Sequence, residues 1–103
     1  MSTTFKKIKF YEPTSYVDAE IFEFEVEGTF QQYQNDLNEP EIEVELVHSN
    51  TPEFDEIILW SKRKKFEAVE FIDESDQPFK FEIHSILPGT GHTSLLIVQT
   101  EQH

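Results

Sequence analysis

Two glutamate triplets are the residues whose type and spacing most clearly suggest a chemical role. Within each triplet, glutamates alternate with apolar residues, in the segments EIFEFEVEG and EIEVELV. A period of two predicts two half-buried β-strands with carboxylates on their outer faces. Carboxylates two residues apart would stand about 7 Å from one another, and two such strands side by side would lie about 5 Å apart. The six carboxylates expected to form one patch belong to Glu23, Glu25, Glu27, Glu41, Glu43 and Glu45.

Such a patch is not a catalytic motif, but it is suited to contact with a basic protein surface. Like charges about 7 Å apart in water repel by only about 0.6 kcal/mol per pair, so a fold can tolerate the patch. A row of carboxylates on a stiff sheet resembles the row of phosphates on a nucleic-acid strand, where Lys and Arg of nucleic-acid-binding proteins make their contacts. The patch therefore suggests a polyanion mimic that contacts a basic protein surface. The alternative interpretation is an ordinary solvated sheet face.

The distribution of charge supports a basic partner. The formal net charge is -13, and residues 10–61 contain fourteen Asp and Glu but no Lys or Arg. This field repels nucleic-acid backbones and anionic lipid, which argues against direct nucleic-acid or membrane binding. The same field accelerates the encounter with a basic surface, such as that of a nucleic-acid-binding protein or a toxin.

One basic segment interrupts this pattern. Lys62, Arg63, Lys64 and Lys65 follow one another and make the chain strongly dipolar. We expect a basic turn at residues 61–65. It has three alternative uses: a solvated loop, a contact with one end of the same partner, or a contact with the acidic face of another copy in a head-to-tail homo-oligomer.

The sequence offers no recognisable catalytic motif, and we expect a non-enzymatic protein. Ser85 and Ser94 have His84 and His92 nearby in the sequence, but neither serine lies in a nucleophile elbow. The segment PGTGHTS at residues 88–94 lacks the lysine and the spacing of a phosphate-binding loop.

Metal and cofactor sites are not predicted either. The four histidines have no HxH or HExxH spacing, although a hairpin between residues 83 and 95 would bring His84 and His92 close together. The segment DESDQ at residues 73–77 lacks the length and the central glycine of a calcium-binding loop, so we expect a polar hairpin turn. A small metal- or ligand-binding barrel that uses the two histidines stays open as an alternative.

Length and composition predict a single folded domain over residues 1–103. A chain of this length can bury a core without disulfides, and ten Phe residues supply apolar material despite the high net charge. There is no Cys, no signal peptide and no stretch that approaches a membrane span. We therefore expect a cytoplasmic location.

The hydrophobic pattern predicts an all-β fold, either an antiparallel β-sandwich or a small barrel of about seven short strands. The first strand mixes lysines with apolar residues on both faces, which is typical of an edge strand. Residues 29–37 fit a short helix or a continuation of the preceding strand. Loops are expected at residues 12–17, 48–55 and 86–92. The strands are expected at residues 4–11, 20–27, 41–47, 57–60, 66–72, 79–84 and 93–100.

The function predicted from these features is a non-enzymatic protein-interaction domain with an inhibitor, immunity or nucleic-acid-mimic role. Its acidic sheet face would contact a basic protein surface. A structural or assembly subunit, of a phage particle or another multiprotein complex, is the main alternative. In that case exposed aromatic residues and sheet edges would make the contacts.

Overall fold

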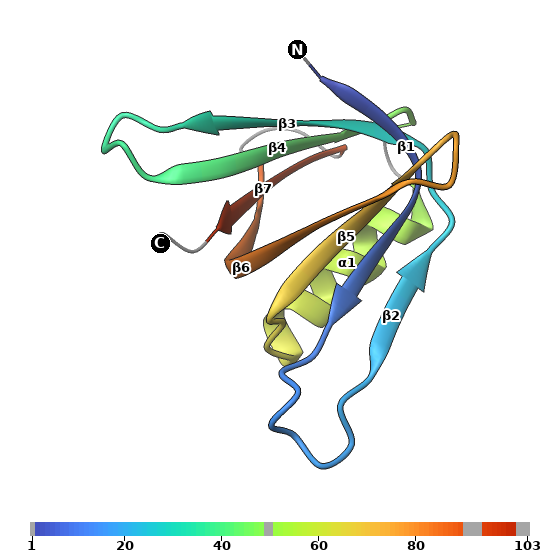
Figure 1. Ribbon diagram of the computed structural model, residues 1–103, viewed down its shortest axis with the longest axis vertical. Coiled ribbons are helices and arrows are strands. Elements are labelled where there is room, and N and C mark those ends of the chain that lie inside the picture. The colour runs from blue at the N-terminus through green and yellow to red at the C-terminus, as the bar shows by residue number, and fades with distance from the viewer. Residues whose placement is uncertain (1, 49–50, 90–93, 101–103) are drawn as a thin grey trace.

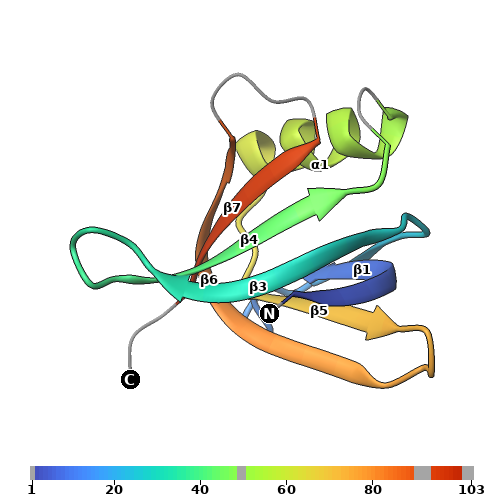
Figure 2. The ribbon, with the colours of Figure 1, turned by 90° about the horizontal axis from the view of Figure 1, so that it is seen from above.

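The protein folds as a small antiparallel β-barrel with one helix (Figures 1 and 2). The computed structural model describes residues 2–48, 51–89 and 94–100. Because the antiparallel sheet closes on itself, the small-barrel form of the predicted fold class is confirmed. Along the chain the elements are β1 (Thr3–Tyr11), β2 (Ile21–Phe24), β3 (Gly28–Gln34), β4 (Pro40–Leu46), α1 (Pro52–Arg63), β5 (Ala68–Asp73), β6 (Pro78–Pro88) and β7 (Leu95–Thr100).

The barrel is a closed ring of strands, in which the consecutive strands β5, β6 and β7 pair as a meander. The sheet order is β2-β1-β3-β4-β7-β6-β5, and an additional pairing of β1 with β5 closes six of the strands into a ring. All of these pairings are antiparallel. The extra strand, β2, pairs only with the second half of β1, whose first half pairs with β3.

The prediction that the first strand is an edge strand is wrong. β1 has a neighbour on both sides along its length, with β5 on one side and β3 followed by β2 on the other. Its lysines lie on the outer surface of the barrel while Phe5, Ile8 and Phe10 are buried. The mixed pattern arises because a register shift between Phe5 and Lys7 changes which positions face inward, from Phe5 before it to Ile8 and Phe10 after it.

The barrel interior is filled by aromatic and branched aliphatic side chains. The rings of Phe30 and Phe71 are stacked with their centroids 4.1 Å apart, and Phe5 packs against Phe71 at 5.2 Å. Burial of rings of this size is the main source of stability in a small domain. The inward positions predicted for β4, namely Ile42, Val44 and Leu46, are all buried.

Of the two alternatives for residues 29–37, the short helix is wrong and the strand is correct, because Gly28–Gln34 forms β3. Each residue from Gly28 to Gln34 has a partner on β4, and Phe30 is buried opposite Val44. Tertiary pairing therefore overrides the weak helical pattern of this polar segment. The turn that follows is stabilised by Asn35, whose Oδ1 accepts hydrogen bonds from the backbone N–H groups of Leu37 and Glu39.

The predicted strand at residues 57–60 is also wrong, because these residues lie in α1. The helix absorbs part of the expected loop at 48–55 and the first residues of the expected basic turn. Thr51 caps it by accepting a hydrogen bond from the backbone N–H of Phe54 at 3.2 Å, and Pro52 occupies the first turn. Phe54 and Ile57 are buried against the core, whereas Leu59 is 42% exposed, so only part of the apolar run at 57–60 lies on the buried face of the helix.

The remaining strands follow the prediction with shifted ends. The hairpin of β5 and β6 is confirmed, with Ile83 buried and its neighbours Glu82 and His84 exposed. β6 continues to Pro88, so the first part of the loop expected at 86–92 is strand; the rest of that loop falls largely outside the described residues. β2 ends at Phe24, earlier than expected, although Val26 is still buried and Glu25 and Glu27 are still exposed.

Candidate functional site

The two glutamate triplets are separated in the fold. β1 and β3 lie between β2 and β4 in the sheet, so the prediction that the two glutamate-bearing strands lie side by side is wrong. The reason is that the chain turns at Gly28 into β3, which pairs with both β1 and β4. A Cβ on Gly28 would stand 2.5 Å from the carbonyl oxygen of Glu45 on β4 and 2.7 Å from the Phe5 ring on β1. The close approach of β3 to these two strands therefore requires glycine at this position.

The first triplet lies beside the lysines of β1. The Lys9 ammonium is 3.4 Å from a carboxylate oxygen of Glu23 and 3.9 Å from one of Glu70. Glu25 and Glu27 line a shallow depression of about 400 Å³ together with two lysines and an aspartate. The charge of this triplet is therefore partly compensated within the molecule. The full lining of the depression is Lys6, Lys7, Glu25, Glu27, Ile72 and Asp76.

An exposed ion pair closes one side of this depression. Lys6 contacts Asp76, which has a positive φ in the tight turn between β5 and β6. The hydrogen bond between them raises the pKa of Lys6 and lowers the pKa of Asp76. In the same turn, Asp73 Oδ1 accepts hydrogen bonds from the backbone N–H groups of Ser75 and Gln77, at 2.8 and 2.9 Å. The polar hairpin turn predicted at residues 73–77 is confirmed.

The second triplet contains one buried glutamate. Glu41 is only 8% exposed, whereas Glu43 is half-buried and Glu45 is exposed. The Tyr33 hydroxyl donates a hydrogen bond to Glu41 Oε1 at 2.8 Å, and Gln99 Nε2 donates one to Oε2 at 3.3 Å. Glu41 therefore joins β3, β4 and β7 on the outer face of the barrel and is not free to contact a partner.

The electrostatics of this network follow from its burial and its hydrogen bonds. Desolvation alone would raise the pKa of Glu41, but the hydrogen bonds from Tyr33, Gln99 and Asn35 together lower it. Desolvation, followed by the bond to Glu41, raises the pKa of Tyr33 to about 12. Ser85 extends the network, because its hydroxyl donates to Gln99 Oε1 at 2.6 Å. The hydroxyl of Ser85, which the sequence places next to His84, therefore donates its hydrogen bond to Gln99 on β7.

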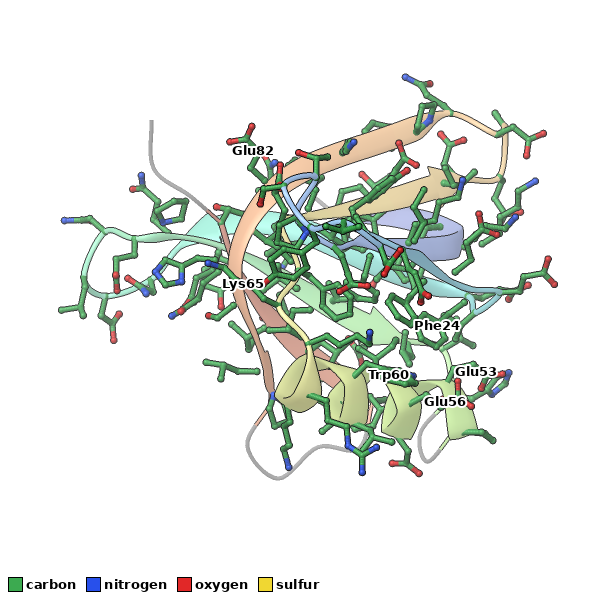
Figure 3. The ribbon with its side chains drawn as sticks, turned by 90° about the horizontal axis from the view of Figure 1, so that it is seen from below. Phe24, Glu53, Glu56, Trp60, Lys65 and Glu82 are labelled. Carbon is green, nitrogen blue, oxygen red and sulfur yellow. The ribbon has the colours of Figure 1, made fainter. Side chains whose placement is uncertain are left out.

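Carboxylates that form no salt bridge with a described residue lie where β4 leads into α1. Glu27 reaches this place through its backbone, because its carbonyl accepts a hydrogen bond from the N–H of Val47 at 3.0 Å. Figures 2 and 3 show that α1 begins beside the end of β4, with Glu53 and Glu56 on the side of the molecule where Phe24 lies. We call this region the acidic end; its residues are Glu27, Glu45, Glu53, Asp55 and Glu56.

The acidic end carries more charge than the fold requires. Glu53 and Asp55 complement the positive N-terminus of α1, which accounts for the two residues in its first turn. No salt bridge within the described ranges reaches any of the five carboxylates. Val47, which follows Glu45 by two residues and donates its backbone N–H to the carbonyl of Glu27, is 56% exposed. The acidic end is therefore a negatively charged surface that also carries an exposed apolar residue.

A basic cleft lies at the other end of α1. It has a volume of about 590 Å³ and is formed by the last turn of the helix, the following connection and the second half of β6. Phe66 and Ile86 are buried beneath it. The cleft was not predicted, because it depends on α1 and on the extension of β6. Its lining residues are Ser61, Lys62, Arg63, Lys64, Lys65, Phe66, His84, Ser85, Ile86, Leu87 and Pro88.

The histidine pair considered from the sequence lies partly outside the described residues. Within residues 2–48, 51–89 and 94–100, no three His, Asp or Glu side chains cluster in a way that could hold a metal ion. His84 is exposed on β6, while His92 and His103 lie outside the described residues, so the proposed approach of His84 to His92 falls outside them too. None of the described helices is long and apolar enough to cross a membrane.

Comparisons with known proteins give no relative. No protein-family model, curated protein or solved structure matches this chain.

Proposed function

We propose that this chain is a non-enzymatic interaction domain that binds a basic protein surface through its acidic end. The observation that carries the proposal is that Glu45, near the end of β4, and Glu53 and Glu56, in the first turns of α1, have no cationic partners among the described residues. Val47, in the connection between these two elements, is 56% exposed. Like-charged groups held together on a rigid scaffold raise the local concentration of an oppositely charged partner and speed its association.

Only some of the six glutamates predicted from the sequence to contact a partner belong to the proposed contact surface. Glu45 stays in the proposed contact surface, with Glu43 beside it on the outer face of β4. Glu41 serves the internal network, and Glu23 pairs with Lys9, so neither contributes a free charge. Glu25 and Glu27 share their depression with Lys6 and Lys7 and contribute less than the sequence suggested.

The partner that fits best is a protein whose own ligand is a polyanion. A lysine- and arginine-rich cleft of a nucleic-acid-binding protein or toxin presents cations to phosphates, and the acidic end offers carboxylates in their place. Occupying that cleft would block it, which gives the domain an inhibitor or immunity role. The exposed Val47 would add an apolar contact to the interface.

The experiment compares two triple variants that lose the same charge at different places. One is Glu45→Gln, Glu53→Gln, Glu56→Gln at the acidic end. The matched control is Asp18→Asn, Asp36→Asn, Glu74→Gln, whose residues are exposed in three separate loops. Each protein is used to capture partners from a lysate of the source cells, with washes at low and at high salt.

The proposal predicts a basic protein that wild type and control capture, that salt releases, and that the acidic-end variant loses. The rate constant for association of this basic protein should be at least about tenfold lower with the acidic-end variant than with wild type, and should change little with the control. Equal capture by all three proteins would refute the role of the acidic end.

A further inference from the structure

The basic cleft is a second surface whose charge is not explained by the fold. Of its four consecutive cations, Lys64 has structural partners: its Nζ lies 3.6 Å from Glu12 Oε1 and over the rings of Phe22 and Trp60. Lys62, Arg63 and Lys65 have no ion pair among the residues that the structure describes, although the chain holds 21 acidic residues. This region therefore keeps a positive potential in an acidic protein.

The helix dipole accounts for only part of this charge. The C-terminus of a helix carries about half an elementary negative charge, and Lys62 and Arg63 in the last turn already complement it. Lys65 lies beyond the helix, and His84 faces the same cleft from β6. Buried Phe66 and Ile86 form an apolar floor, beside which Leu87 is 47% exposed. An occupant of this cleft should therefore combine carboxylates with an apolar side chain.

The acidic end of the same protein has this chemistry. It presents Val47, which is 56% exposed, beside Glu45 and the carboxylates of the first turns of α1. Charge and polarity are thus complementary: one surface combines cations with an apolar floor, and the other combines carboxylates with an exposed apolar residue.

A single molecule cannot join these two surfaces. They lie at opposite ends of α1, whose 12 residues span about 18 Å. Figure 3 shows Glu53 and Glu56 at one end of the helix and Lys65 at the other. The complementary surfaces can meet only between molecules.

We propose that the basic cleft binds the acidic end of a second copy of this chain. The contact is heterologous, because different surfaces of the two molecules meet, and it leaves one free cleft and one free acidic end on each pair. Association therefore continues beyond a dimer, into an open chain or a closed ring.

The net charge makes this association weak and dependent on ionic strength. Two molecules of charge -13 repel each other at low salt. At physiological ionic strength the Debye length is about 8 Å, which screens repulsion between whole molecules more than contacts inside the cleft. High salt then weakens those contacts as well. Association should be strongest at intermediate ionic strength.

Sedimentation velocity over a range of protein concentrations tests the proposal. Wild type should form species larger than a dimer as concentration rises. The cleft variant Lys62→Gln, Arg63→Gln, Lys65→Gln should stay monomeric, as should the acidic-end variant Glu45→Gln, Glu53→Gln, Glu56→Gln. A matched control, Lys6→Gln, Lys7→Gln, Lys80→Gln, makes the same change in charge on the outer barrel surface and should associate as wild type does.

Mixing the two monomeric variants gives the sharpest result. The intact cleft of the acidic-end variant meets the intact acidic end of the cleft variant, so an equimolar mixture should form dimers and nothing larger. Circular dichroism of each variant confirms that it is folded. A monomeric wild type at every concentration, or a mixture that stays monomeric while wild type associates, would overturn the proposal.

This proposal uses the acidic end assigned above, but it does not need a foreign partner. The cleft variant leaves the acidic end intact and should capture the basic partner as wild type does. Failure of self-association therefore leaves the proposed function standing. Failure to capture a basic partner, with the mixing result intact, would leave the acidic end as an assembly surface alone.

Discussion

Replacing Glu41 tests whether this residue holds strands together or contacts a partner. In Glu41→Ala the Tyr33 hydroxyl and the Gln99 amide lose their acceptor, on half-buried side chains that water reaches only in part. Hydrogen bonds to charged groups contribute about 1.5–3 kcal/mol each, and partial solvation reduces this. We expect a loss of about 2 kcal/mol in the free energy of unfolding at neutral pH. For a domain of this size that corresponds to a fall of about 10 °C in Tm.

The pH dependence gives the same test a second readout. The folded-state pKa of Glu41 is lowered from its ordinary value of 4.5, so the unfolded chain binds this proton more readily than the folded chain. The stabilisation is therefore fully present above the unfolded value and is lost as pH falls through the folded pKa. The difference in stability between wild type and Glu41→Ala should shrink below about pH 4.5.

Chemical denaturation at several pH values measures both effects. Glu43→Ala is the matched control, because Glu43 lies on the same face of β4 and the structure gives it no hydrogen bond; it should change stability by less than about 0.5 kcal/mol. Capture of the basic partner by Glu41→Ala should be unchanged under conditions where the variant is folded. Equal stability of wild type and Glu41→Ala at neutral pH, or an equal loss in Glu43→Ala, would refute this account of the network.

Three further predictions concern the elements that place these surfaces. Gly28→Ala should destabilise the fold by about 1–3 kcal/mol, because the added Cβ would collide with the Glu45 carbonyl and the Phe5 ring. Thermal unfolding measures this loss, and an unchanged Tm would contradict the close approach of β3 to β4. Thr51→Ala should lose about 1 kcal/mol through the missing cap of α1, while Thr51→Ser should retain it. The phenols of Tyr11 and Tyr33 should ionise only near pH 12 in the folded protein, followed by absorbance of the phenolate; ionisation of both near pH 10 would contradict the bonds to Glu70 and Glu41.

The strands with a clean period of two could be predicted from the sequence. In β4 each apolar side chain enters the core and each glutamate faces outward, as the alternation indicates. The hairpin of β5 and β6 follows for the same reason, with its turn marked by the polar residues 73–77.

The helix was missed although the sequence contains its start signal. Thr51 followed by Pro52 is a common N-cap and first-turn pair, and the acidic first turn and basic last turn complement the helix dipole. The run of four apolar residues at 57–60 concealed the helical period, because Leu59 is 42% exposed while Ile57 is buried.

The separation of the glutamate triplets could not be predicted from local pattern. The separation depends on which strands pair. β3 contains too few apolar residues for its sequence to predict a strand between β1 and β4. The burial of Glu41 also depends on strand pairing. Its hydrogen-bond partners are Tyr33 on β3 and Gln99 on β7, and Gln99 is 58 residues away in the sequence.

The most direct measurement of the central claim is the association rate constant of the captured basic partner with three proteins, each at low and at high salt. These are wild type, the acidic-end variant Glu45→Gln, Glu53→Gln, Glu56→Gln, and its control Asp18→Asn, Asp36→Asn, Glu74→Gln. The account predicts a rate at least about tenfold lower, with a weaker salt dependence, for the acidic-end variant alone. Equal rates and equal salt dependence for the two triple variants would contradict it.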